Sequence, residues 1–278
     1  MINWRQTKRP GGSFLKIIVC VKQVPGTTQV DLDPETGVMK RDGASAKLNP
    51  YDLFAIETAL ELAAATGGSV RTLTMGPPQA REALLETVWM GADGGVLVSD
   101  RRLGGADVLA TARTLAQAVA RMGEYDLILC GKQTTDGDTA QVGAELAEFL
   151  DLPHAGNVRC VTPGEGWVDA RVSLDDRDEL QRLPLPCLLC MDKDVNTPRL
   201  PSYFRKKALE ADPVTVLSLD DFADRDPGHF GLSGSPTQVE RTFPPERSAR
   251  RVMLDGGDLA AAAQLARLLR DKKFVQEG

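Results

Sequence analysis

The chain has 278 residues, and its 33 lysines and arginines against 39 aspartates and glutamates give a formal net charge of −6. Hydrophobic residues make up 42% and charged residues 26%, a composition typical of a folded protein and not of a disordered one. The acidic balance argues against a nucleic-acid partner, because counterion release requires clustered lysines and arginines. With only two histidines, histidine-based acid–base relays and metal sites are nearly excluded. The chemistry must therefore come from carboxylates, from the backbone or from a bound cofactor, and we follow the last of these; we expect no metal site.

The first residues do not have the pattern of a signal peptide. Residues 1–14 are polar and Gly-rich, and the apolar run at 17–21 is shorter than the ~7–15 residues of a signal sequence. No other stretch has the ~20 apolar residues of a membrane helix. We expect a disordered extension over 1–14 and no membrane span. Five cysteines, four of them in or beside apolar strand-like runs, indicate reduced thiols and a cytoplasmic location.

Cys187 and Cys190 form the one C-x-x-C motif. The motif is either half of a zinc site or a redox pair, or it is two small core residues in a strand. Side chains alternate between the faces of a strand, so a separation of three places these two cysteines on opposite faces. No second Cys/His pair is present to complete a zinc site. We favour the core interpretation.

Short β-branched runs alternate with helical patterns through the first half of the chain. Strands are predicted over 16–22, 69–75, 95–99 and 125–130, and helices over 50–66, 79–90, 106–122 and 138–150. Asn49 and Pro50 are typical of a helix N-cap and first helical position, and Asp138 is interpreted as the N-cap of the fourth helix. The alternation predicts an α/β fold: a doubly wound, mostly parallel sheet with helices on both faces.

The pattern changes after residue 152. Strands are predicted over 166–173 and 185–192 around an acidic turn, followed by a short basic helix over 201–208. From residue 221 the chain is rich in Gly, Pro and Ser, and it closes with one amphipathic helix over 258–274. We divide the chain into an extension (1–14), an α/β domain (15–220) and a C-terminal arm (221–278). Because some 50 residues with one helix cannot bury a core, we expect the arm to pack on another subunit; a flexible tail is the alternative.

In an open parallel sheet, ligands bind outside the carboxyl ends of the strands. Four loops follow predicted strands there, at 22–25, 74–80, 99–107 and 131–139, and three of them place glycines directly before a helix. Glycine lets the backbone approach a phosphate, and a helix N-terminus offers free N–H groups. Lys132 adds a cation, and Asp136 is expected to accept a hydrogen bond from a ribose or adenine group. No dinucleotide G-x-G-x-x-G motif, P-loop or nucleophile elbow occurs.

These loops resemble those of the β (small) subunits of electron transfer flavoproteins, over about residues 16–274. The most specific motif, from Gly131 to Gly143, wraps an adenine nucleotide in that family. The end of the first strand, the Asn49–Pro50 pair and the segment 75–77 also match nucleotide contacts of the family. The segment 192–201 resembles the family's partner-recognition loop, whose exposed leucine, here Leu200, docks on an acyl-CoA dehydrogenase.

The resemblance implies cofactor-binding residues in five segments, with the backbone N–H groups near Gly76 and Gly131 holding a phosphate. The residues are Cys20, Val21 and Lys22; Asn49, Pro50, Tyr51 and Asp52; Met75, Gly76 and Pro77; Asp100, Gly104, Gly105, Ala106, Asp107 and Thr111; and Gly131, Lys132, Gln133, Thr134, Thr135, Asp136, Gly137, Asp138, Thr139, Ala140, Gln141 and Val142.

The family comes in two kinds. In one, the β subunit holds AMP as a structural element; in the other, it binds a second FAD that takes electrons from NADH and splits them between two acceptors. The segment 104–111 resembles the FAD-binding kind, so we expect FAD, with AMP as the alternative. Two departures are the segment 101–103, where relatives carry an aromatic-containing stretch, and Ala144, where many have proline. The first leaves the contacts to the flavin ring open.

The resemblance also implies partners. We expect a heterodimer with an α subunit, an acyl-CoA or hydroxy-acid dehydrogenase as a further partner, and ferredoxin or flavodoxin as a low-potential acceptor. A second alternative, from another class, is a stand-alone adenine-nucleotide-binding module of the stress-protein type.

Overall fold

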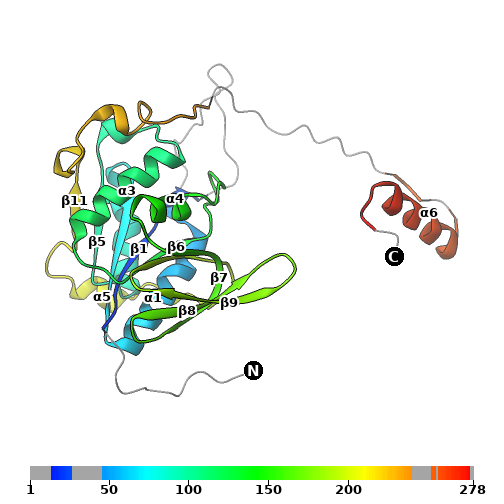
Figure 1. The fold of residues 1–278 in the computed structure, drawn as a ribbon, viewed down its shortest axis with the longest axis horizontal. Helices are drawn as coiled ribbons and strands as arrows, with labels where there is room; N and C mark the ends of the chain where they lie inside the picture. The colour runs from blue at the N-terminus through cyan, green and yellow to red at the C-terminus, as the bar shows by residue number, and fades with distance from the viewer. Residues whose placement is uncertain (1–13, 27–45, 240–251, 255, 276–278) are drawn as a thin grey trace. The chain divides into compact units, whose positions relative to one another are not determined.

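A nine-stranded sheet forms the centre of the chain's first unit, which runs to Glu240; a second unit covers 241–278 (Figure 1). The computed structural model describes residues 14–26, 46–239, 252–254 and 256–275. The predicted extension over 1–14 therefore lies, apart from Phe14, outside the described residues.

The order of the strands in the sheet is β11-β5-β4-β1-β6-β10-β7-β8-β9. Their bounds are β1 (Lys16–Cys20), β4 (Ser69–Met75), β5 (Gly94–Val98), β6 (Leu127–Gly131), β7 (His154–Pro163), β8 (Trp167–Ser173), β9 (Asp178–Pro184), β10 (Cys187–Met191) and β11 (Val214–Leu217). The strands from β11 to β7 pair in parallel, whereas β8 and β9 extend the sheet antiparallel at one edge. A separate antiparallel pair joins β2 (Gln23–Pro25) and β3 (Ala46–Leu48). The predicted mostly parallel sheet is confirmed.

Helices cover both faces of this sheet (Figure 1). The helices are α1 (Pro50–Thr66), α2 (Arg81–Met90), α3 (Val108–Met122), α4 (Val142–Phe149), α5 (Tyr203–Ala208) and α6 (Asp258–Asp271). Along β1, Ile17 and Val19 enter the core that α1 and α2 cover, while Ile18 and Cys20 enter the core beneath α3 and α4. Because both faces of β1, β6 and β10 are buried, these strands are almost continuously apolar, as parallel strands between two helical layers require.

The two cysteines of the C-x-x-C motif lie on opposite faces of β10, as predicted. Cys187 belongs to the core beneath α1, and Cys190 to the core beneath α3 and α4. Burial raises the pKa of the Cys187 thiol to about 12, which makes it unreactive at neutral pH. The motif therefore serves the packing of the sheet.

Three strands of the large sheet, the interior strand β7 and the two edge strands β9 and β11, have no counterpart in the predicted elements. In β9, exposed and partly buried residues alternate, and Asp178, Glu179 and Arg182 occupy a strand of seven residues. Charged side chains are tolerated there because one face of an antiparallel edge strand is solvated. Because these charged residues have a low β-propensity, a search for apolar runs does not find the strand.

The boundary of the C-terminal arm lies later than the predicted residue 220. Phe222 and Phe230 are almost fully buried in the core beneath α3, with ring centroids 6.0 Å apart. Residues 221–239 therefore belong to the first unit. The Gly- and Pro-rich composition obscured two buried aromatic side chains that are too far apart to form a periodic pattern.

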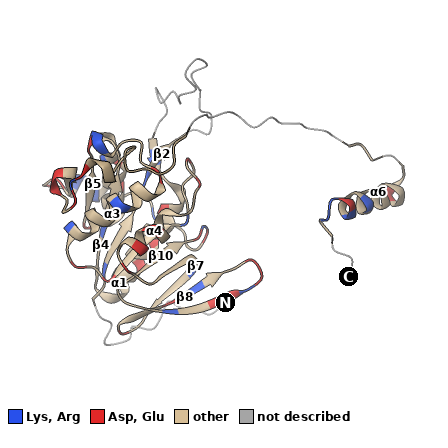
Figure 2. Ribbon diagram, turned by 45° about the horizontal axis from the view of Figure 1, so that its top comes forward, with Lys and Arg blue, Asp and Glu red and all other residues tan. Residues whose placement is uncertain are grey.

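In the second unit, α6 is a single amphipathic helix with no buried residue. Leu259 is 89% exposed and Leu265 44% exposed, while the charged side chains gather toward the two ends of the helix (Figure 2). An apolar stripe of this kind needs a surface to cover it. Among the described residues, none of the helices is long and apolar enough to cross a membrane.

Candidate nucleotide-binding site

The sheet changes its winding direction between β1 and β6, and ligands of such folds bind at this point, beyond the carboxyl ends of the strands. The loops that follow β1 and β6 meet here. Lys22, after β1, places its Nζ 2.9 Å from the Asp136 carboxylate, in the loop after β6. Burial raises the pKa of Asp136, but the hydrogen bond and the charge of Lys22 outweigh it, and the net shift is downward. Lys22 thus competes for the carboxylate that we expected to serve a ribose or adenine group.

The start of α1 joins the same two loops. Pro50 takes the first helical position, as predicted, but the Asn49 side chain makes no cap hydrogen bond. Its Nδ2 instead donates to the backbone oxygen of Gln133 at 2.9 Å, and its Oδ1 accepts from the N–H of Thr135 at 3.3 Å. Asn49 therefore positions the backbone of the loop after β6.

The backbone N–H groups of Gly76 and Gly131 themselves are engaged inside the protein; the prediction that N–H groups near them hold a phosphate stays a prediction. Gly76 donates to the oxygen of Val98 at 3.0 Å, and Gly131 donates to the buried carboxylate of Asp52. Both bonds join segments far apart in the sequence. A phosphate bound here would use other N–H groups of these loops.

Donors are present at the start of α4. The helix begins at Val142 with Gln141 at the N-cap position, and no side chain caps it. The first N–H groups of a helix have no partner within it and favour an anion. The preceding residues 135–141 are exposed. This arrangement fits the phosphate of an adenine nucleotide.

Asp138 is not the N-cap of this helix, which corrects the prediction. Its φ is 53°, and its Oδ1 accepts a hydrogen bond from Gln133 Nε2 at 2.6 Å. Ala140 also has a positive φ, 55°. Left-handed backbone at non-glycine residues costs free energy and concentrates at binding sites, where successive N–H groups form anion-binding concavities. The helix starts four residues later than predicted because the chain adopts this conformation first.

A second cluster lies where α3 begins. Asp107 caps α3 by accepting from Ala110 N at 3.0 Å, and it also accepts from Thr237 Oγ1 at 2.7 Å. The Ser235 side chain does not cap the helix; its Oγ accepts a hydrogen bond from the backbone N–H of Asp107 at 2.8 Å. Sequence analysis missed Ser235 and Thr237, because a contact across about 130 residues leaves no local signal. The exposed Gly104–Gly105 turn therefore lies against the segment 231–237.

Glu145, in the first turn of α4, faces this cluster. Its Oε2 is buried and has no hydrogen-bond partner within the part of the chain that the structure describes. Burial and the charge of Asp107 raise its pKa. A buried carboxyl oxygen without a partner is costly, so a ligand hydroxyl group would suit it. Sequence analysis did not single out Glu145.

The other predicted residues occupy the same end of the sheet or support it. Asp100 is engaged by Arg102, whose guanidinium lowers the pKa of that carboxyl to about 2. Gln23 Nε2 donates to the oxygen of Gln79 at 3.2 Å, which places the loop after β4 beside the loop after β1. Lys132 Nζ lies 3.6 Å from the Asp192 carboxylate. Cys20, Val21, Tyr51, Met75, Pro77, Ala106, Thr111, Thr134, Gly137, Thr139 and Gln141 lie on these loops or at the adjoining ends of strands and helices, and their contacts to a cofactor remain predictions.

The loop that carries Leu200 is tied to α1. Asn196 Nδ2 donates to Phe54 O at 3.0 Å, and Arg199 pairs with Glu57 of α1 at 2.8 Å. Leu200 itself is 87% exposed. A large apolar side chain on a firmly held loop suits a docking contact. Two further exposed rings beside it, Tyr203 (64%) and Phe204 (83%), escaped the sequence analysis.

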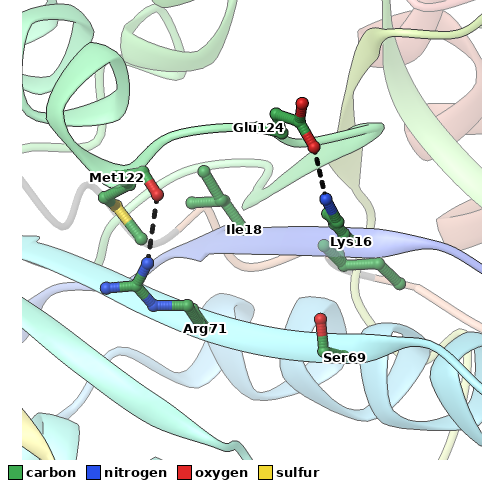
Figure 3. A pocket seen from close by; sticks show the side chains of 7 residues that line it. Lys16, Ile18, Ser69, Arg71, Met122 and Glu124 are labelled. Atoms are coloured by element: carbon green, nitrogen blue, oxygen red, sulfur yellow. Dashed lines mark hydrogen bonds and ion pairs between the residues drawn. The ribbon is translucent and has the colours of Figure 1, made fainter.

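A hollow of about 260 Å³ lies at the opposite end of the strands (Figure 3). Its polar groups pair with one another: Arg71 Nη1 donates to Met122 O at 3.1 Å, and Lys16 Nζ pairs with Glu124 at 2.5 Å. Because this hollow lies at the amino ends of β1 and β4, it is separate from the predicted ligand site.

Comparison with known proteins agrees with this geometry. The model of the electron transfer flavoprotein domain matches residues 36–221. The chain belongs to the electron transfer flavoprotein family. The chain is 38% identical to the electron transfer flavoprotein subunit beta of Clostridium acetobutylicum, in a match that covers 94% of this chain and 100% of the relative. It is 39% identical to the caffeyl-CoA reductase-Etf complex subunit CarD of Acetobacterium woodii and 36% identical to the acryloyl-CoA reductase electron transfer subunit gamma of Anaerotignum propionicum. Each match again spans 94% of this chain and 100% of the relative.

The comparisons confirm the family that the motif after β6 indicated. The chain therefore has the role of an electron transfer flavoprotein β subunit. Two of these relatives are named as subunits of a caffeyl-CoA reductase complex and of an acryloyl-CoA reductase.

Proposed function

We propose that this β subunit binds FAD at the loops after β1, β5 and β6, and that it functions in a heterodimer with an α subunit. The observation that carries the proposal is the uncapped N-terminus of α4, preceded by the left-handed residues Asp138 and Ala140. Free N–H groups there suit the phosphate of an adenine nucleotide. FAD, when bound, supplies the redox chemistry that the side chains of this histidine-poor chain lack.

FAD is favoured over AMP by the loop after β5. The segment 104–111 resembles the FAD-binding kind of β subunit, and its Gly104–Gly105 turn is exposed. The unpaired Oε2 of Glu145, beside Asp107, supplies an acceptor for a ligand hydroxyl. AMP would leave more of this surface uncovered than FAD, because it lacks the flavin half.

For the whole complex, we propose electron bifurcation in the cytoplasm. The complex takes electrons from NADH and passes them to an acyl-CoA or hydroxy-acid dehydrogenase and to ferredoxin or flavodoxin. The names of two relatives, which include caffeyl-CoA reductase and acryloyl-CoA reductase, support an acyl-CoA partner. Leu200 is proposed to dock on it, and the apolar stripe of α6 is proposed to pack on the α subunit.

The test is the cofactor content of the co-expressed heterodimer. Acid extraction and chromatography are expected to give two FAD per heterodimer and no AMP. One FAD with one AMP would refute the FAD assignment and leave the alternative of a non-bifurcating carrier. A stable homodimer without flavin, obtained from the chain expressed alone, would instead favour the stress-protein type of module.

A further inference from the structure

Asp52 is a buried carboxylate at the point where the loops of the nucleotide site meet. It lies in the first turn of α1 and is 4% exposed. One oxygen, Oδ2, accepts from the N–H of Lys22 at 2.7 Å, and Oδ1 accepts from Asn49 Nδ2 at 2.8 Å. The N–H of Gly131 donates to the same carboxylate. These three bonds join the ends of β1 and β6 to the start of α1.

No space is left between Asp52 and these loops. A Cβ on Gly131 would overlap Asp52 Oδ1 and would lie 2.8 Å from the carbonyl carbon of Tyr51. Through Asn49, the network continues to the backbone oxygen of Gln133 in the loop that leads to α4. Asp52 therefore acts on the site through the backbone, and a ligand cannot reach its carboxylate in this arrangement.

We propose that Asp52 is the positioning residue of the nucleotide site, and that its ionised carboxylate holds the ends of β1 and β6 in register for binding. The inference rests on the proposed function and deepens it. Three N–H donors surround the two oxygens, and a carboxylate accepts from all of them. A proton on either oxygen would face a donor and displace at least one of these bonds. Nucleotide affinity therefore depends on the ionised form.

The ionisation of Asp52 falls within the physiological range. Burial raises its pKa to about 7, against the opposing effects of the Asn49 and Lys22 hydrogen bonds and the Lys22 charge. Below this pH the carboxyl is protonated in the folded protein, and above it the carboxylate is ionised. Affinity is therefore expected to fall as the pH decreases through about 7.

The other titratable groups on the strands against α1 do not interfere with this titration. The Cys130 thiol of β6 lies beside Asp52; Cys190 lowers its pKa, but Cys20 and burial raise it well above the usual value. Contact with Cys130 and burial raise the pKa of Cys190, on β10, in the same way. Both thiols are neutral near pH 7. From β4, Arg71 donates to a backbone oxygen at the amino end of the sheet.

The chain offers a matched control. At the amino end of β1, the Asp126 carboxylate accepts from the N–H of Lys16 at 2.7 Å, as the Asp52 carboxylate accepts from the N–H of Lys22 at the carboxyl end. Asp126→Asn and Asp52→Asn therefore make the same change at the two ends of β1: each removes a carboxylate charge and replaces one acceptor oxygen by an NH₂ group. Only Asp52→Asn makes this change at the nucleotide site.

The experiment measures FAD affinity by fluorescence titration of the heterodimer after its nucleotides have been removed, from pH 6 to pH 8, with AMP as a second probe at pH 8. Asp52→Asn is expected to weaken FAD binding at pH 8 by roughly 10- to 100-fold, the contribution of about one buried hydrogen bond to a charged group. It is also expected to abolish the pH dependence of the affinity. Asp126→Asn is expected to retain both the affinity and the pH profile of the unsubstituted complex.

The outcomes separate the two proposals. An unsubstituted complex that binds neither FAD nor AMP would refute the proposed function, and this inference with it. If the unsubstituted complex binds FAD and Asp52→Asn binds it with equal affinity, the inference is overturned and the proposed function stands. An equal loss in Asp126→Asn would overturn it too, because general weakening of β1 would then explain the effect. If Asp52→Asn does not assemble, the unsubstituted complex decides: FAD affinity that falls toward pH 6 supports the inference, and constant affinity overturns it.

Discussion

Replacing Arg199 by methionine removes the guanidinium that holds the Leu200 loop on α1. Its Nη2 lies 2.8 Å from Glu57 Oε1 and its Nε lies 2.9 Å from Oε2, so the pair is bidentate. The Glu57 side chain is 7% exposed and that of Arg199 is 43% exposed. Arg199→Met therefore leaves a buried carboxylate with one remaining bond, from the backbone N–H of Arg199 at 3.0 Å.

The cost follows from this asymmetry. Removing one partner of a fully buried ion pair costs about 3–5 kcal/mol. Because Arg199 is partly exposed and the backbone bond remains, we expect about 2–3 kcal/mol, allowing for solvent screening. For a unit of this size, each kcal/mol lowers the unfolding temperature by about 2–4 °C, so the expected loss is about 4–12 °C.

The effect has a defined pH dependence. Burial raises the pKa of Glu57, but the Arg199 hydrogen bonds and charge outweigh it, so the net pKa lies below the usual 4.5. A carboxyl whose pKa is lowered on folding stabilises the protein above its unfolded pKa, and this contribution is lost as the pH falls through the folded value. The difference in unfolding temperature between the unsubstituted complex and Arg199→Met is therefore expected to be greatest near pH 7. It is expected to become smaller below about pH 4.5.

Scanning calorimetry of the heterodimer tests the prediction with a double-mutant cycle of Arg199→Met and Glu57→Gln. We expect a coupling free energy of about 1–2 kcal/mol, because the double variant leaves no buried charge unpaired. Arg205→Met, in the exposed basic segment of α5, is the control and is expected to melt within about 1 °C of the unsubstituted complex. Additive effects in the cycle, or an Arg199→Met variant that melts like the control, would refute the reasoning.

Three further predictions concern the docking loop and the site. Leu200→Ala is expected to raise the KM for the dehydrogenase about tenfold with an unchanged unfolding temperature, and an unchanged KM in steady-state assays would exclude a docking role. Gly143→Ala places a methyl group on the Cys190 sulfur and is expected to cost about 1–3 kcal/mol in thermal unfolding, whereas Gly137→Ala, with no atom closer than 3.6 Å, is expected to be neutral. Asp136→Ala is expected to weaken adenine-nucleotide retention during gel filtration; full retention would assign Asp136 a structural role.

Local sequence patterns were sufficient to predict the helices and strands whose residues are buried at regular intervals. The apolar runs identified β1, β4, β5, β6, β8 and β10, and the helical patterns identified α1 to α6 within the described residues, because burial on one or two faces imposes its period on the sequence. The Asn49–Pro50 start of α1 was predicted from the preferences of asparagine for the N-cap and of proline for the first helical position. The start of α4 was wrong by four residues, since capping preferences cannot distinguish an N-cap aspartate from one in left-handed backbone.

The sequence by itself determined the fold class and the family, because apolar periodicity and a 13-residue motif can be recognised without information on long-range contacts. It also predicted which loops form the nucleotide site. Only the tertiary structure decided which groups in those loops remain free. The N–H groups of Gly76 and Gly131 donate to the Val98 oxygen and to the Asp52 carboxylate, which lie 22 and 79 positions away in the chain. A hydrogen bond between two distant segments cannot be recognised from the composition of either segment. Only the folded structure therefore shows that the free N–H donors lie at the start of α4.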